Sequence, residues 1–212
     1  MEFTVEEIRV LGCLIEKSKT TPEQYPLSSN SLMVACNQKT SREPVVKYSQ
    51  QVVDEAVKSL REKGFARTVK PQGSRGHKHK HIIEEALDTN LFESSILAVL
   101  MLRGAQSAGE LKQRTDRYCD FEDNQQVLDT LINLSQRNEP IVKNIGRFSG
   151  QSQDRWIELL SPQAEPNLEV IQSSEKISTY VDETQEDNVA TALEERVTRL
   201  EKRLKHIEEN LF

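Results

Sequence analysis

The 212-residue chain carries 28 Lys and Arg residues against 34 Asp and Glu, a formal net charge of −6, and 36% of its residues are hydrophobic. This length predicts one or two domains. No apolar run approaches the ~18 residues of a membrane span, and the acidic start Met1–Glu7 lacks the basic residues of a secretory signal. We therefore expect a cytoplasmic protein that contacts no membrane. Cys13, Cys36 and Cys119 form no C-x2-C pair, which predicts reduced thiols and neither a disulfide framework nor a zinc site.

Charge is distributed unevenly along the chain. Residues 1–83 hold 14 Lys and Arg against 9 Asp and Glu (net +5), residues 84–161 hold 8 against 13 (net −5), and residues 162–212 hold 6 against 12 (net −6). Affinity for a phosphate backbone scales with the number of phosphates that a protein neutralises. Any contact with nucleic acid is therefore expected in the first segment, and the acidic second segment is a poor candidate for that role.

The first segment predicts three helices and a pair of strands. Thr4, Ser28 and Ser49 are suitable N-caps, and Gly64 is placed to stop the third helix. A glycine-rich turn then separates two short runs with strand character. The predicted elements are helices over 4–17, 28–37 and 49–63, a strand over 65–70, and a return strand that ends at Ile82–Ile83.

The second segment predicts the same order of elements. Gly104 ends its first helix, and a turn at residues 146–150 separates its two strands. The predicted elements are helices over 93–103, from 108 onward and over 122–137, and strands over 141–145 and 155–159.

The two third helices share the pattern V-x3-[VL]-x2-L, 74 residues apart, at Val53, Val57 and Leu60 and then at Val127, Leu131 and Leu134. Three helices followed by a two-stranded ribbon are typical of a winged helix, a helix-turn-helix-like fold that usually lays its third helix in a DNA major groove. The fold is therefore predicted to be mainly α with small β wings. We expect a basic winged-helix domain over 1–85, an acidic one over 90–161, a flexible linker over 162–188 and a coiled-coil helix over 189–212.

The first copy is longer than the second. Its first and third helices are 45 residues apart (Ile8 to Val53), against 31 in the second copy (Ile96 to Val127). The 14 extra residues fall largely in two proline-containing loops. Extra loop in an otherwise matching unit is where added function tends to lie.

The end of the chain carries a heptad pattern. In a parallel pair, Arg196 and Arg203 at position g would face Glu201 and Glu208 at position e, so parallel association is favoured. The alternative is an amphipathic helix that folds back on its own domain. Three heptads are marginal alone, so a dimer would be completed elsewhere, in the second domain. Predicted oligomerisation positions are Ala190, Leu193, Val197, Leu200, Leu204, Ile207 and Leu211.

Double-stranded DNA is the partner that the basic first segment predicts. On the third helix, Asp54, Glu55 and Glu62 share the exposed surface and would repel phosphates, so much of the attraction would come from the loop before it and from the wing. The alternative is a solvated face on a protein-binding winged helix. Predicted nucleic-acid contacts are Lys39, Arg42, Lys47, Gln50, Gln51, Lys58, Arg67, Lys70, Arg75, Lys78 and Lys80.

The wing strand alternates histidine and lysine. On a strand, His77, His79 and His81 would share one face at intervals of about 7 Å, and Lys78 and Lys80 would lie on the other. His-x-His pairs bind zinc, but a site needs further ligands, and no Asp, Glu or Cys stands nearby before Glu84 and Glu85. A basic wing strand is the preferred interpretation, and no metal or other cofactor is predicted.

Catalytic motifs are missing from the sequence. It contains no G-x-S-x-G, P-loop, H-E-x-x-H or G-x-G-x-x-G segment, and its few histidines lie in the wing or, as His206, in the heptad run. Adjacent carboxylates such as Glu84–Glu85 are expected by chance in a chain with 29% charged residues. We therefore predict that the protein is not an enzyme.

Three segments, residues 21–27 (TPEQYPL), 35–45 (ACNQKTSREPV) and 102–111 (LRGAQSAGEL), resemble signature segments of the bacterial YceH family. The resemblance covers both copies, and the heptad tail also looks like that family's end. It implies tandem winged helices, and no functional residue can be carried over. One departure is Lys78-His79-Lys80-His81, where relatives tend to have tyrosine in a K-Y-x-H stretch.

Two functions follow as hypotheses. The first is a homo-oligomeric DNA-binding protein, such as a transcriptional regulator, in which the basic copy contacts DNA and the acidic copy packs or dimerises. The second is a protein-interaction scaffold that uses winged helices without nucleic acid, which the overall acidity and the long linker favour. A more distant third is a small-molecule or metal sensor with the wing histidines or Cys36 as ligands.

Overall fold

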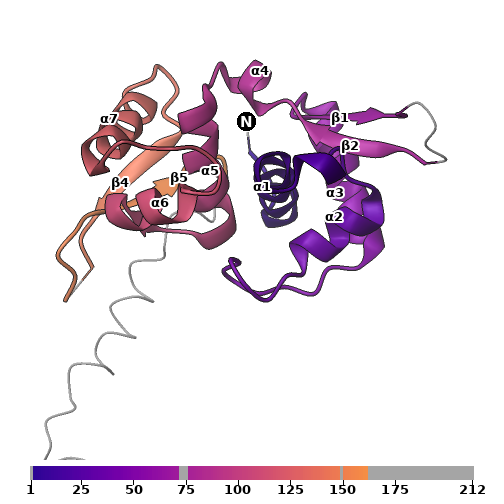
Figure 1. The fold of residues 1–212 in the computed structure, drawn as a ribbon, viewed down its shortest axis with the longest axis horizontal. Helices are drawn as coiled ribbons and strands as arrows, with labels where there is room; N and C mark the ends of the chain where they lie inside the picture. The colour runs from indigo at the N-terminus through magenta and orange to yellow at the C-terminus, as the bar shows by residue number, and fades with distance from the viewer. Residues whose placement is uncertain (1, 72–75, 149, 162–212) are drawn as a thin grey trace, which may run out of the picture. The chain divides into compact units, whose positions relative to one another are not determined.

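The structure of the protein is a computed structural model that describes residues 2–71, 76–148 and 150–161 (Figure 1). Within these residues the chain is mainly helical, with two small antiparallel sheets. None of the described helices is long and apolar enough to cross a membrane. The predicted linker over 162–188 and coiled-coil helix over 189–212 lie outside the described residues.

The three helices predicted for the first half are present. They are α1 (Val5–Thr20), α2 (Ser29–Cys36) and α3 (Gln50–Glu62). Thr4 forms a capping box with Glu7, and the hydroxyls of Ser28 and Ser49 accept hydrogen bonds at the starts of α2 and α3. Gly64, with φ of 81°, follows the end of α3 in the left-handed region that glycine favours. The predicted caps therefore explain where the three helices begin and where α3 ends.

The hairpin of the first half consists of β1 (Ala66–Val69) and β2 (Lys78–His81), in antiparallel register from Ala66–His81 to Val69–Lys78. A short 3-10 helix, η1 (Pro22–Gln24), precedes Leu27, which forms an isolated antiparallel bridge with His79 on the other edge of β2. The predicted extension of the return strand to Ile83 is wrong. Ile83 is fully buried and begins α4 (Ile83–Leu87), a short helix that the sequence analysis did not predict.

The second half repeats this order. It contains α5 (Leu91–Arg103), β3 (Gln106–Ser107), α6 (Ala108–Thr115), α7 (Asn124–Ser135), β4 (Val142–Gly146) and β5 (Arg155–Glu158). The strand order is β3-β5-β4, so the last strand is central. In the first half β2 is likewise flanked by β1 and by the Leu27 bridge. Strand β3 was not predicted, since two residues are too few to show a period of two.

Helix α1 packs against α5, and this contact joins the two halves. Leu11, Leu14 and Leu97 are among the side chains fully buried in the shared core. Gly12 lies at the crossing, where a Cβ atom would come within 3.0 Å of side-chain atoms of Met101 and Leu102. The backbone N–H of Phe3 also donates to the carbonyl of Leu160 at 3.0 Å. The two halves therefore share one core through α1.

Candidate nucleic-acid interface

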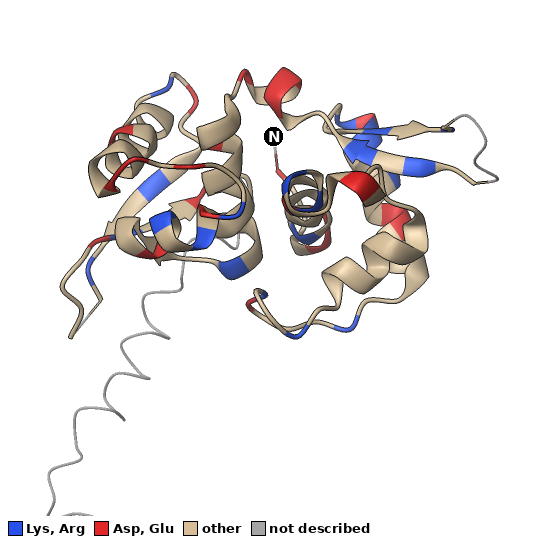
Figure 2. Cartoon of the chain, in the orientation of Figure 1, with Lys and Arg blue, Asp and Glu red and all other residues tan. Residues whose placement is uncertain are grey.

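Exposed cations gather on the hairpin of the first half and on the connection between α2 and α3 (Figure 2). Lys39 and Lys47 are exposed on that connection, residues 37–49, which we call the α2–α3 loop. Most of the remaining predicted cations are exposed or half-buried, and Arg75 lies outside the described residues. Exposed are Lys58, Arg67 and Lys70; half-buried are Lys78 and Lys80.

Strand β2 separates its histidines from its lysines, as strand alternation predicts. His79 is buried, and its ring nitrogens lie 3.0 Å from the hydroxyls of Ser29 and Thr68. Burial lowers the pKa of His79, which favours the neutral ring. Lys80 lies opposite Arg67 in the register on the other face of the hairpin. Arg67 also pairs with Glu85 at 2.8 Å, so an internal carboxylate offsets part of the like-charge repulsion on this face, and Lys80 remains available to an anionic partner.

His81 anchors the base of the hairpin. Its Nε2 lies 3.0 Å from Ser18 Oγ, and its Nδ1 lies 3.2 Å from Glu84 Oε2 as an ion-pair contact that is poorly aligned for a hydrogen bond. Burial alone would raise the pKa of Glu84, but the close approach and the charge of His81 outweigh it and hold that pKa at about 2. The tyrosine hydroxyl of Tyr25 accepts the backbone N–H of His81 at 2.7 Å.

The arrangement of Ser18, His81 and Glu84 resembles the catalytic triad of a serine hydrolase, but its hydrogen bonds connect structural elements and do not activate the serine. Ser18 Oγ donates to the carbonyl of Ile15, one turn back on α1, at 2.7 Å. A nucleophile would instead donate its proton to the imidazole. The cluster thus fastens β2 to α1. Within the described part of the chain, no group of three His, Cys, Asp or Glu side chains is placed to hold a metal ion.

The exposed face of α3 is internally paired. Gln50 donates to Asp54 at 3.1 Å and Gln51 donates to Glu55 at 2.9 Å, each one helical turn along. Lys58 lies 4.0 Å from Glu62 in the same i, i+4 relation. The predicted base-reading residues Gln50, which is half-buried, and Gln51, which is exposed, thus each already have a carboxylate partner. This face is polar with nearly balanced charge.

Arg42 is a predicted DNA contact that the structure contradicts. Its side chain is fully buried and forms a bidentate ion pair with Glu16, at 3.1 Å and 2.5 Å. It also donates to the carbonyl of Ala35 at 3.1 Å and to Gln38 at 3.0 Å. Burial opposes the charge on Glu16, but the hydrogen bond from Arg42 lowers the pKa of that carboxyl. The prediction that Arg42 contacts DNA is wrong, because its guanidinium is enclosed and fully paired.

Sequence reasoning missed the contacts that hold the α2–α3 loop. Asn37 closes its base by donating to the carbonyl of Tyr48 at 2.8 Å and accepting its N–H at 2.7 Å. Ser41, in the middle, adopts φ of 60° and accepts a hydrogen bond from Arg103 of α5 at 2.6 Å. These partners are up to 62 residues apart, and no local pattern signals such a pairing. Cys36, at the start of the loop, is buried together with Cys13.

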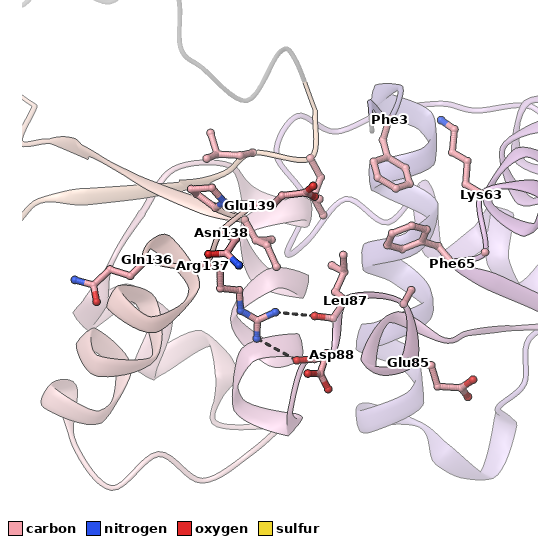
Figure 3. A pocket seen from close by; sticks show the side chains of 16 residues that line it. Phe3, Lys63, Phe65, Glu85, Leu87, Asp88, Gln136, Arg137, Asn138 and Glu139 are labelled. Carbon is pink, nitrogen blue, oxygen red and sulfur yellow. Dashed lines mark hydrogen bonds between the residues drawn. The ribbon is translucent and has the colours of Figure 1, made fainter.

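A groove of about 1360 Å³ lies between the end of α3, α4 and the connection from α7 to β4 (Figure 3). Arg137 closes one side by donating to the carbonyls of Leu87 and Asp88 and to Glu93 at 2.9 Å. Lys63, on the other side, pairs with Glu7 at 2.7 Å. Both cations of the groove are thus occupied by internal partners. The groove has none of the free cations that an anionic ligand needs.

Comparison with known proteins places the chain in a family. A family model described as "Protein of unknown function, DUF480" matches residues 3–151. A UPF0502 protein of Shewanella frigidimarina (strain NCIMB 400) is 40% identical over 213 residues, which cover 98% of each chain. A UPF0502 protein of Shewanella baltica (strain OS185) is 40% identical and covers 96% of this chain and 90% of its own length. One of Shewanella loihica (strain ATCC BAA-1088 / PV-4) is 44% identical and covers 80% of each. The chain therefore belongs to the DUF480 family, and the relatives named above are UPF0502 proteins, in agreement with the YceH-like resemblance of its signature segments.

Proposed function

We propose that this protein binds double-stranded DNA through its first half and that its two halves are tandem winged-helix units. The repeated order of helices and strands supports the fold assignment, since the last strand is central in both halves. In such units the third helix and the hairpin form the usual DNA-binding surface. In the first half these are α3 and the hairpin β1–β2, which we call the wing.

One observation carries the proposal, namely the cationic outer face of the wing. Lys78 and Lys80 form no ion pair among the described residues, while the neighbouring His79 and His81 are held inward by Ser29, Thr68 and Ser18. Side chains on a strand fixed in this way present their charges at a defined spacing. Lys39 and Lys47 add charge from the α2–α3 loop.

The proposed binding is largely independent of DNA sequence. Asp54, Glu55 and Glu62 stand among the exposed residues of α3, and they repel the phosphates that flank a major groove. Attraction therefore comes from the wing and the α2–α3 loop, which contact the backbone. Backbone contacts set affinity and salt dependence but carry no direct base recognition.

The test is fluorescence anisotropy of the full-length protein with random-sequence duplex DNA at several salt concentrations. Replacing Lys70, Lys78 and Lys80 by alanine should reduce the magnitude of the log–log salt slope by about 2.7, from ~0.9 per lost phosphate contact. The matched control replaces Arg117, Lys143 and Arg147 of the second half, which removes the same charge, and should leave the slope unchanged. Absence of salt-sensitive binding by the unmodified protein would refute the proposal.

A second candidate function is a protein-interaction scaffold, and the surface of α7 favours it. Helix α7 occupies the position of α3 in the second half, but it contains no Lys or Arg, and Ile132 is 38% exposed on it. A polar helix face with an exposed apolar residue suits a protein partner better than a phosphate backbone. This function predicts that binding to duplex DNA stays undetectable even at low salt.

We also propose that the heptad positions from Ala190 to Leu211 tie protomers together in a homo-oligomer. The alternating charges at positions e and g support a parallel arrangement. Truncation before Ala190 should lower the molar mass measured by light scattering. An unchanged mass would contradict this role for the tail and leave the second half as the remaining candidate interface.

A further inference from the structure

The α2–α3 loop carries two of the proposed DNA contacts, Lys39 and Lys47, yet most of its anchors lie elsewhere in the molecule. From these anchors we infer that the second half positions this loop for DNA binding, with Arg103 and Tyr118 as positioning residues that do not themselves touch DNA. This inference rests on the proposed function. It adds that the DNA-binding surface of the first half needs contacts from the acidic second half to hold its shape.

The backbone of the loop is held in an unfavourable conformation at Ser41. Its φ of 60° lies in the left-handed region, which residues with a Cβ atom rarely adopt. Two arginines hold this turn in place. Arg103 donates to Ser41 Oγ at 2.6 Å, and Arg42 donates to the Ser41 carbonyl at 2.8 Å. A strained residue persists only where its surroundings determine it, so these contacts, together with the hydrogen bond that Arg9 of α1 donates to the carbonyl of Pro44 at 2.6 Å, fix the path of the loop.

Helix α5 adds a backbone contact beside the strained turn. The N–H of Glu43 donates to the carbonyl of Leu102 at 2.8 Å. This carbonyl lies in the last turn of α5, where helices leave carbonyl groups without an intrahelical partner. The loop therefore completes the C-terminal end of α5, and α5 fixes the loop two residues beyond Ser41.

Tyr118 makes the third connection, through the buried ion pair. Its hydroxyl donates to Glu16 Oε1 at 3.2 Å, the same carboxylate that holds Arg42. Tyr118 follows α6, so this contact runs from the second half, through α1, to the loop. Arg42 in turn holds both ends of the segment that contains Lys39, through the carbonyl of Ala35 and the carbonyl of Ser41.

Lys39 lies within this fixed segment and Lys47 follows it, and both side chains are exposed. If the loop were free, their ammonium groups would be spread over many positions, and holding them at two phosphates would cost conformational entropy. Fixing the loop beforehand removes part of that cost. The acidic half thus contributes to DNA affinity without presenting a cationic surface of its own.

The experiment compares the double variant Arg103→Ala/Tyr118→Phe with Lys39→Ala/Lys47→Ala in full-length protein, by anisotropy with random-sequence duplex DNA. The lysine variant should reduce the magnitude of the log–log salt slope by about 1.8, from ~0.9 for each of two lost phosphate contacts. The anchor variant keeps both lysines, so it should lower the affinity at a fixed salt concentration several-fold with a smaller change in slope, because ordering the released loop costs conformational entropy. In the Lys39→Ala/Lys47→Ala background, the same anchor changes should lower the affinity no further. Arg103→Lys, which keeps a donor for Ser41 Oγ, should retain most of the affinity when combined with Tyr118→Phe.

Arg117→Ala is the charge control. Arg117 is exposed next to Tyr118, so the variant removes the same charge from the second half without touching the α2–α3 loop. Its affinity and its salt slope should equal those of the unmodified protein. An unchanged affinity in Arg103→Ala/Tyr118→Phe, or a quadruple variant in which the two losses of binding free energy add up, would overturn the inference.

Amide hydrogen exchange of the DNA-free protein separates this inference from the proposed function. In Arg103→Ala/Tyr118→Phe, amides of residues 37–49 should exchange faster while those of α1 and α5 stay protected. Loss of protection throughout would indicate global unfolding and would count against a local positioning role. If the loop is released but the unmodified protein binds no DNA, the proposed function fails while the second half still holds the loop.

Discussion

The two halves of this protein differ in surface while sharing a framework. In each, the third helix buries the same three positions, Val53, Val57 and Leu60 in α3 and Val127, Leu131 and Leu134 in α7. Their exposed residues have diverged, giving net charges of +5 over residues 1–83 and −5 over 84–161. A repeated core thus constrains only the buried positions, which leaves each surface free to acquire its own partner.

The connections of the two halves differ as well. The α2–α3 loop spans residues 37–49, against 116–123 between α6 and α7, and the longer loop contributes Arg42 to a buried ion pair with Glu16 of α1. The sheet shows the reverse trend, since the second half has the strand β3 where the first has a single bridge at Leu27. The half with less sheet therefore depends more on side-chain contacts to hold its shape.

The largest expected effect is a loss of stability when the buried side-chain contacts of the first half are broken. Arg42→Ala should lower the free energy of unfolding by about 3–5 kcal/mol, because it leaves the carboxylate of Glu16 buried without its partner. Lys39→Ala, an exposed change in the same loop, should stay within about 0.5 kcal/mol of the unmodified protein. Urea denaturation measures both. Similar stabilities for the two variants would show that the loop does not depend on its buried arginine.

The second effect belongs to the acidic half. Burial raises the pKa of Glu158 to about 7, against hydrogen bonds from the N–H groups of Leu160 and Ser161, from a usual value of 4.5. A carboxyl that binds its proton more tightly when folded stabilises the protein most at low pH. This contribution should fall by about 3 kcal/mol as the pH rises from 4.5 to 7.

Glu158→Gln should remove that part of the pH dependence. Melting temperatures measured from pH 4.5 to 8 should fall less steeply in this variant than in the unmodified protein. If the melting temperatures of the two proteins fell equally with pH, the carboxylate of Glu158 would be better solvated than its burial indicates. The acidic half would then lack this pH-dependent contribution to stability.

The smallest effect concerns the contact that joins the halves. Gly12 lies in α1 against α5, whereas Gly109 in α6 faces only the amide group of Gln153, at 3.3 Å from a Cβ atom. Both Gly→Ala changes gain similar helix propensity. Gly12→Ala should nevertheless be the less stable variant by about 1–3 kcal/mol, because the added methyl overpacks the crossing. Thermal unfolding compares them, and equal stabilities would indicate a looser crossing between α1 and α5.

Much of the fold could be predicted because its signals are local. Thr4, Ser28 and Ser49 cap the helices that they were expected to cap, and the period of Val53, Val57 and Leu60 identifies the buried face of α3. The wing alternation was also readable, since strand geometry alone separates His79 from Lys78 and Lys80.

The buried polar contacts could not be predicted in this way. Arg42 stands in a polar loop, and its sequence neighbourhood indicates an exposed side chain. Only the approach of Glu16, 26 residues earlier, provides the charge that allows its burial. Contacts with Arg103 and Tyr118 depend on how the halves pack, and helical periodicity identifies a buried face without identifying its partner.

The hydrogen bond between Phe3 and Leu160 has a geometric consequence. Residues 2 and 161 are the first and last that the structure describes. They lie close together in space although nearly all the described residues stand between them in the sequence. An energy-transfer pair attached at the exposed Glu2 and at the partly exposed Leu160 would thus start at high efficiency. Any opening between α1 and α5 would separate the two dyes and lower the transfer efficiency. Energy transfer between these positions would therefore report movement at the interface between the two halves.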